Sequence, residues 1–267
     1  MSSFHLGKLT SALNIVSDLA KGIAPFVCLA GIVVSQSQEY RKSAQKLDYA
    51  DYVSQENQQG ELIAWQQKSP KLGFDNLVAD WSYLNFVQYF GDADARETIG
   101  YRLVPEYFAA IADIDPHFTQ AHLRLSIANS MYAGNAAETV ALMNEILAYT
   151  DPESADSALL WTSKGLDELL FLGNKQAAIN SYKIAAKWAN ISQSDRPDGL
   201  TIKDLEEALE STDDIDLKEA QIRAWSSVLV HIRDNNQRDE IISRISHLKA
   251  EISVLEQAEK QSDKINN

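Results

Sequence analysis

The chain has 267 residues, of which 45% are apolar, and a formal net charge of −14 from 38 acidic and 24 basic side chains. The excess of acid argues against nonspecific nucleic-acid binding, because phosphates are bound through positive charge. The single cysteine, Cys28, excludes an internal disulfide framework. With only 11 glycines and 6 prolines the chain is poor in turn-forming residues, so we expect an all-α protein.

The N-terminal segment, residues 1–38, carries a membrane signal. Residues 22–38 contain no charged side chain, and their apolar centre at 23–34 is interrupted by Pro25. This centre is shorter than the ~20 apolar residues of a comfortable bilayer span. The alternatives are a single-span anchor, a cleaved signal peptide and a helix of a soluble protein, and we favour the anchor. Its apolar side chains would be Ile23, Phe26, Val27, Leu29, Ile32 and Val33.

A polar, helical stretch follows over residues 39–69. The dipeptide Ser69-Pro70 ends it, because the residue before a proline disfavours the α conformation. We interpret this stretch as a stalk, with the first helix of a solenoid as the alternative.

Residues 81–91 are unusually aromatic. Trp81, Leu84 and Val87 recur at helical spacing, and such stripes are more often core than ligand cage. Tyr83 and Gln88 accompany this stripe, and we expect the stripe to pack in the core.

Three helical hairpins are predicted between residues 70 and 192. Gly91, Gly134 and Gly173 each follow one apolar helix and precede another. They are 43 and 39 residues apart, which exceeds the 34-residue tetratricopeptide repeat and predicts insertions. The insertions are expected at 92–100 and 151–156. The second helices of the first two pairs end at Asp115-Pro116 and Asp151-Pro152. The hairpins therefore span about 76–114, 118–148 and 157–189.

The third hairpin shows the tetratricopeptide pattern most clearly. Gly173 allows the chain to reverse between two helices, Ala178 and Ala185 share one face two turns apart, and Tyr182 fills the space between them. Together with Gly134, these are the predicted repeat-packing residues.

Four strings are more specific than the repeat pattern: GFDNLVADW at 73–81, LNFVQYFGD at 84–92, YAG at 132–134 and DELLFLG at 167–173. Through them the chain resembles a family of cyanobacterial membrane-anchored tetratricopeptide repeat (TPR-like) proteins over residues 70–189. The resemblance implies a TPR-like helical-hairpin solenoid, an N-terminal hydrophobic helix that anchors it, and a photosynthetic setting. The family has no established activity that could be transferred.

Residues 193–267 are predicted to form an acidic segment and C-terminal capping helices. Eight carboxylates and two lysines lie within residues 203–219. Such a run is ordinarily a solvated surface, and the alternative is a docking patch for a basic partner. The candidate patch residues are Glu206, Glu207, Glu210, Asp213 and Asp214.

Two apolar stripes follow the acidic segment, the second with heptad spacing. We expect them to cap the end of the solenoid, with dimerisation as the alternative. The stripes consist of Ile222, Trp225, Leu229 and Ile232, and of Ile241, Ile245, Leu248, Ile252 and Leu255.

No motif for catalysis is present. None of the five histidines has another three or four positions away, and there is no nucleophile elbow, phosphate loop or dinucleotide fingerprint. We therefore expect no metal site, no cofactor and no enzyme activity.

The expected function is that of a membrane-tethered scaffold or adaptor that binds a protein partner, a subunit or an assembly intermediate of a membrane complex. By analogy with the family, assembly of a photosynthetic complex is the expected setting, in the thylakoid or plasma membrane of a cyanobacterium. The alternative is a permanent structural subunit of a larger membrane complex.

Overall fold

The computed structural model describes residues 47–154, 156–192 and 202–266, and every regular element in these ranges is a helix. This confirms the all-α prediction. Contacts divide the chain into residues 1–48 and 49–267, and the described helices belong to the second unit. The predicted anchor residues lie outside the described ranges. Within those ranges no helix is both long and apolar enough to cross a membrane.

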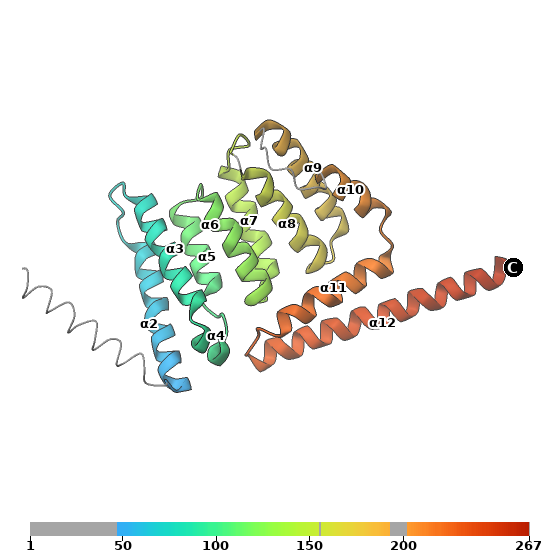
Figure 1. Cartoon of the computed structure of the whole chain (residues 1–267), viewed down its shortest axis with the longest axis horizontal. Helices are drawn as coiled ribbons and strands as arrows, with labels where there is room; N and C mark the ends of the chain where they lie inside the picture. Colours follow the sequence, from blue (N-terminus) through green and yellow to red (C-terminus); the bar gives the residue numbers. More distant parts are fainter. Residues whose placement is uncertain (1–46, 155, 193–201, 267) are drawn as a thin grey trace, which may run out of the picture. The chain divides into compact units, whose positions relative to one another are not determined.

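Figure 1 shows the helices in chain order. In chain order they are α2 (Tyr49–Lys68), α3 (Asp75–Gly91), α4 (Ala93–Ile99), α5 (Val104–Ile114), α6 (Thr119–Ile127) with the π-helix η1 (Ala128–Tyr132) as its continuation, α7 (Ala136–Tyr149), α8 (Ser157–Leu170), α9 (Lys175–Ser192), α10 (Ile202–Ser211), α11 (Asp214–Leu229) and α12 (Asn235–Asn266).

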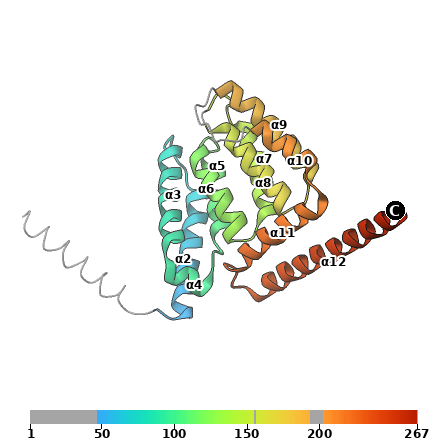
Figure 2. The same ribbon diagram turned by 45° about the vertical axis from the view of Figure 1, so that its right-hand side comes forward.

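Successive helices form three pairs that stack on one another. α3 packs on α5, α6 and η1 pack on α7, and α8 packs on α9. The pairs stack because α5 also contacts α7 and α6 also contacts α8. Figure 2 shows the same helices from a second direction. The main core lies between these pairs, with Phe108, Ile111 and Leu125 fully buried at its centre.

α2 packs against the first pair, so it is not a free stalk. It contacts α3, α4 and α5, and it buries Tyr52, Glu56, Ile63 and Gln66. The Oγ of Ser82 on α3 donates a 2.9 Å hydrogen bond to Oε1 of Gln66. The packed-helix alternative is therefore the one that the described part of residues 39–69 supports.

The turn glycine of the first pair is Gly100, and the assignment of Gly91 to this turn was wrong. Gly91 is the last residue of α3, and α4 occupies the predicted insertion before the chain turns into α5. Gly100, Gly134 and Gly173 share a positive φ, with values of 76°, 75° and 67°. The first two are 34 residues apart, and the last two are 39 apart.

α11 and α12 form a C-terminal hairpin that lies against all three of these turns. Gln221 lies beside Gly173, and Arg233 lies beside Gly100. At Gly134 the approach is closest, since a Cβ there would lie 2.9 Å from Nε2 of Gln237. Gln237 Nε2 also donates a 2.8 Å hydrogen bond to the carbonyl of Ala133. The hairpin therefore joins the three pairs along one edge, where Figure 1 shows α11 and α12 side by side.

A buried carboxylate, Glu56 on α2, holds the first pair in place. It accepts hydrogen bonds from Tyr89 Oη at 2.8 Å, from Arg96 at 3.3 Å and from Arg102 Nε at 2.7 Å. The guanidinium of Arg96 also lies 3.6 Å from the centre of the Tyr89 ring. One anion thereby connects α2, α3, α4 and the turn before α5.

Gly165→Ala tests the close contact between α8 and α9. A Cβ at Gly165 would lie 2.7 Å from Cε1 of Tyr182, whose buried ring has little room to move. We expect this change to lower the free energy of unfolding by about 1–3 kcal/mol. The control is Gly60→Ala inside α2, where Cδ2 of Leu103 lies 3.5 Å away. This control should raise the free energy of unfolding by about 0.5–1 kcal/mol, and urea denaturation that shows the same sign for both variants contradicts the packing.

Glu56→Ala tests the buried carboxylate. The change leaves Arg96, which is 5% exposed, without its anion, so we expect the free energy of unfolding to fall by roughly 3–5 kcal/mol. The control is Glu61→Ala on the exposed side of the same helix, which should change it by less than about 0.5 kcal/mol. Equal denaturation midpoints for the two variants would exclude a structural role for Glu56.

Candidate functional site

A largely apolar groove of about 440 Å³ lies between α3 and the continuous helix α6–η1. We call it the α3–α6 groove. Its size is within the range of sites that accept one or two side chains or a small ligand. It is lined by Tyr83, Phe86, Val87, Phe90, Gly91, Arg124, Ile127, Ala128 and Tyr132.

Aromatic rings pack together along the floor of the groove. Phe86 is buried, and its ring centre lies 5.9 Å from that of Tyr83 and 5.6 Å from that of Phe90. Phe90 in turn meets Tyr132 of η1 edge to face at 4.9 Å. Such tilted and edge contacts fix the ring positions, so the floor is preformed.

Trp81, Leu84 and Val87 are exposed on α3, so the prediction of core packing was wrong for these three side chains, whereas the neighbouring Tyr83 is partly buried against the core. Trp81 is 58% exposed, Leu84 54% and Val87 47%. α3 is apolar on both sides, and the side that packs inward carries Ala79, Ser82, Phe86 and Tyr89. The exposed side extends the apolar surface of the groove along α3.

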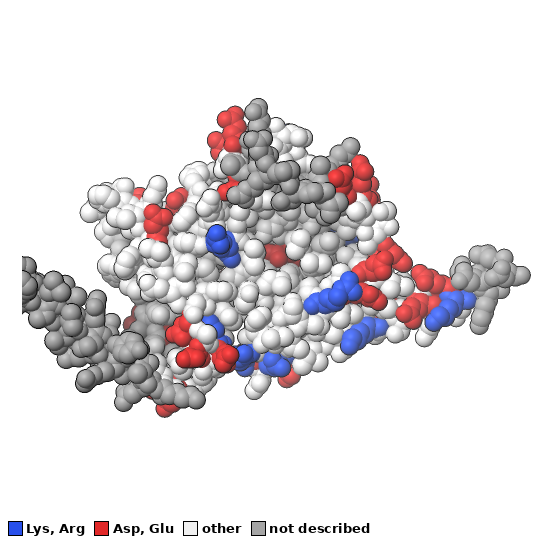
Figure 3. All heavy atoms as spheres, viewed as in Figure 1, with Lys and Arg blue, Asp and Glu red and all other residues white. Residues whose placement is uncertain are grey.

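Among the described residues, Arg124 is the only charged one that lines the groove. It is exposed on α6, one turn before Ile127, which is 54% exposed. Within the described ranges its guanidinium makes no hydrogen bond or ion pair. In Figure 3 charged side chains are sparse over the middle helices and gather at the edges and along α11 and α12.

The π-helix η1 is positioned by a buried polar contact to α8. The Oγ of Ser130 donates a 2.9 Å hydrogen bond to Oδ2 of Asp167. Burial, together with the nearby charge of Glu168, raises the pKa of Asp167 to about 7. π-helical turns often occur at functional sites, and here the turn places Tyr132 against both Phe90 and the groove.

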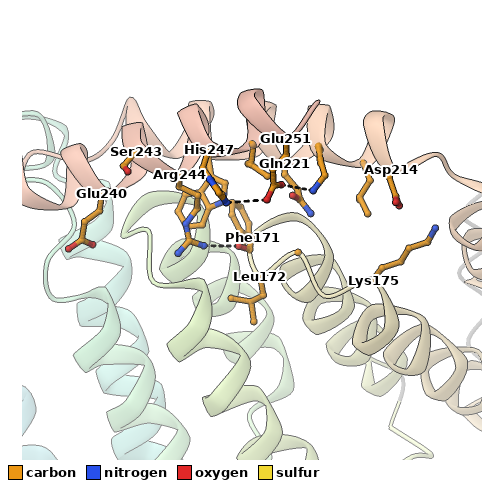
Figure 4. A pocket seen from close by; sticks show the side chains of 15 residues that line it. Phe171, Leu172, Lys175, Asp214, Gln221, Glu240, Ser243, Arg244, His247 and Glu251 are labelled. Carbon is orange, nitrogen blue, oxygen red and sulfur yellow. Dashed lines mark hydrogen bonds and ion pairs between the residues drawn. The ribbon is translucent and has the colours of Figure 1, made fainter. Parts of the chain in front are cut away.

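A second, more polar pocket of about 850 Å³ lies between the C-terminal hairpin and the turn from α8 to α9 (Figure 4). Its central side chains are bound to the protein itself. Arg244 donates a 3.1 Å hydrogen bond to the carbonyl of Phe171, and Glu251 pairs with Lys218 at 2.6 Å and with His247 at 3.1 Å. The Arg244 contact holds the hairpin against the turn, and the contact of Lys218 with Glu251 joins α11 to α12.

The predicted repeat-packing residues lie at turns and between helices. Ala178, Tyr182 and Ala185 are buried on α9, where the Tyr182 ring meets Gly165 of α8. Gly134 and Gly173 occupy the turns that face the C-terminal hairpin.

The predicted acidic patch is spread over two helices. Glu207 and Glu210 are exposed on α10, and the side chain of Glu206 lies outside the described part. Asp213 caps α11 and accepts a hydrogen bond from the amide of Ile215, and Asp214 begins that helix. These carboxylates lie far along the chain from the α3–α6 groove and contribute none of its lining.

No cluster of three or more possible metal ligands occurs among the described residues. The one fully buried histidine in this part of the chain, His122, bonds the carbonyl of Asp115 through Nε2 at 3.0 Å. Burial lowers its pKa to about 4, so it is neutral near pH 7 and acts in packing.

Comparisons with protein-family models, curated proteins and solved structures gave no match to this chain.

Arg124 and Ile127 were missed at the level of sequence, although one signal was present. Arg124 is the only Lys or Arg between Arg102 and Lys164. Eight carboxylates occur in the same stretch, namely Glu106, Asp113, Asp115, Glu138, Glu145, Asp151, Glu153 and Asp156. A lone cation in so acidic a segment is a reason to look for an anionic ligand.

The raised pKa of Asp167 predicts a pH dependence of stability. The folded state holds this proton up to about pH 7 and the unfolded state releases it near pH 4, so folding stability should fall as the pH rises between these values. Asp167→Asn removes the charge and keeps the partner for Ser130. The free energy of unfolding of this variant, relative to that of the wild type, should rise by more than about 1.4 kcal/mol between pH 4 and pH 8, since one pKa unit corresponds to this value. Chemical denaturation at several pH values measures this rise. The exposed control Glu145→Gln should show none. A difference between Asp167→Asn and the wild type that does not change with pH contradicts the raised pKa of Asp167.

Proposed function

We propose that the protein is a membrane-tethered scaffold of TPR-like hairpins that binds a protein partner in the α3–α6 groove. The observation that carries this proposal is the open groove itself, whose rigid aromatic floor and exposed rim have no covering element among the described residues. A preformed apolar surface of this kind suits the binding of another chain.

The 34-residue distance between Gly100 and Gly134 supports the TPR-like description, since both glycines occupy the same turn of successive helix pairs. The tight approach of α8 and α9 at Gly165 supports it as well. The tether rests on the charge-free residues 22–38. A photosynthetic membrane, where the scaffold would assist assembly of a complex, is the setting that the family resemblance suggests, and the role is binding rather than catalysis.

A permanent structural subunit is the alternative, and the exposed apolar surface of α2 and α3 favours it. Large apolar patches mark surfaces that are covered in an assembly. The exposed side chains are Leu62 and Trp65 on α2, Leu72 and Phe74 in the connection to α3, and Leu77, Trp81, Leu84 and Val87 on α3.

Site-specific photo-crosslinking in the native cells tests the proposal. A photoreactive residue at Val87 in the groove should give a defined adduct with one partner, and the same residue at Val254 on α12 should not, although both positions are exposed. A third probe at Glu210 reports on the acidic segment.

The outcomes separate the alternatives. A Val87 adduct whose partner otherwise leaves during salt washing supports a scaffold, and a partner retained in fixed stoichiometry supports a permanent subunit. Adducts at Glu210 without any at Val87 would move the binding site to the acidic segment. If neither Val87 nor Glu210 gives an adduct, or if Val87 and Val254 give identical adducts, protein binding in the groove is contradicted.

A further inference from the structure

The α3–α6 groove combines two chemical features that restrict its ligand. Its floor is formed by the rings of Tyr83, Phe86 and Phe90, and its rim by Val87 and Ile127. A volume of about 440 Å³ accommodates one or two large side chains of a bound segment. The apolar lining therefore selects a bulky apolar residue.

Arg124 adds a positive charge at the edge of this apolar surface. No carboxylate of the described part of the chain lines the groove, whereas the whole chain has a net charge of −14. An acidic segment is repelled by the net charge of the chain, so an unpaired arginine beside an apolar groove favours its binding there. The planar guanidinium can donate two parallel hydrogen bonds to one carboxylate.

We infer that the groove binds a peptide segment in which a bulky apolar side chain lies close to an Asp or Glu. This inference rests on the proposed protein-binding function and specifies the partner's chemistry. Arg124 and Ile127 are three positions apart on one helix, and such side chains are about 5–6 Å apart. The carboxylate and the apolar side chain of the partner therefore lie about one helical turn apart, at i and i+3 or i+4 if the segment is helical.

Selection from a displayed library of random 12-residue peptides tests the inference. The full-length protein in nanodiscs is the target, and empty nanodiscs remove peptides that bind lipid. Wild type should enrich peptides with Leu, Ile, Phe or Trp within four residues of Asp or Glu. Arg124→Glu should instead enrich peptides with Lys or Arg in place of the acid. The matched control Arg223→Glu, at an exposed arginine of α11, should give the wild-type preference.

Binding of the enriched peptides gives the quantitative test. Arg124→Gln should weaken it about tenfold and reduce its dependence on salt, because a charge-assisted hydrogen bond is lost. Ile127→Asp should abolish it. Both residues are exposed, so circular dichroism and the melting temperature should remain those of the wild type.

Three results would overturn the inference: no enriched peptide, enrichment without an acidic preference, or an acidic preference that Arg124→Glu leaves unchanged. The proposed function fails separately, when Val87 gives no specific crosslink in cells. A Val87 crosslink without acidic preference would leave the binding site in place and remove only the carboxylate partner.

Discussion

The anion of Glu56 is the contact on which the first half of the structure depends. It is 2% exposed, and a carboxylate buried to this extent is tolerated only when positive charge and hydrogen-bond donors surround it. Arg96, Arg102 and Tyr89 supply them from three different parts of the chain. The geometry allows one orientation of α3, with Tyr89 inward and Val87 outward. The apolar wall of the groove on the outer side of α3 therefore depends on Glu56, which is buried against the inner side of α3.

The C-terminal hairpin provides a second constraint, at the turns. Stacked helix pairs contact mainly their neighbours, so such arrays are stabilised locally. Here α11 contacts both α8 and η1, and the turn that follows it reaches the loop before α5. Arg233 Nε donates a 2.8 Å hydrogen bond to the carbonyl of Glu97 on α4. The hairpin thereby joins successive pairs from outside the pairs.

Much of the helix order was predictable, because local chemistry determines it. α2 ends one residue before Ser69-Pro70, α5 begins with Pro105 in its first turn, and α7 ends shortly before Asp151-Pro152. The side of α3 that is buried was not predictable, because Trp81 and Phe86 lie on opposite faces that are equally apolar. Only the packing of α2 and α5 distinguishes these faces, and it depends on Glu56, whose burial no local pattern indicates.

The candidate site was only partly predictable for a related reason. Its aromatic residues stand out in the sequence, yet their role depends on α6, which begins 28 positions after the end of α3. Arg124 lies within no motif. The sequence does not distinguish Gly100 as the turn glycine, because α4 separates it from the end of α3 and Gly91 directly follows an apolar run.

The hairpin contacts also affect how the chain folds as it is synthesised. The carbonyl of Ala133 can accept its hydrogen bond only after Gln237, 104 positions later, has been synthesised. The carbonyl of Glu97 requires Arg233, 136 positions later. At ribosomal rates of roughly 5–20 residues per second the first of these delays is about 5–20 s, far longer than helices need to form. The helix pairs can therefore assemble from local contacts while their turns remain uncovered. Completion of the edge is a late, high-contact-order step, and chains that end before α11 would present those turns to chaperones and proteases.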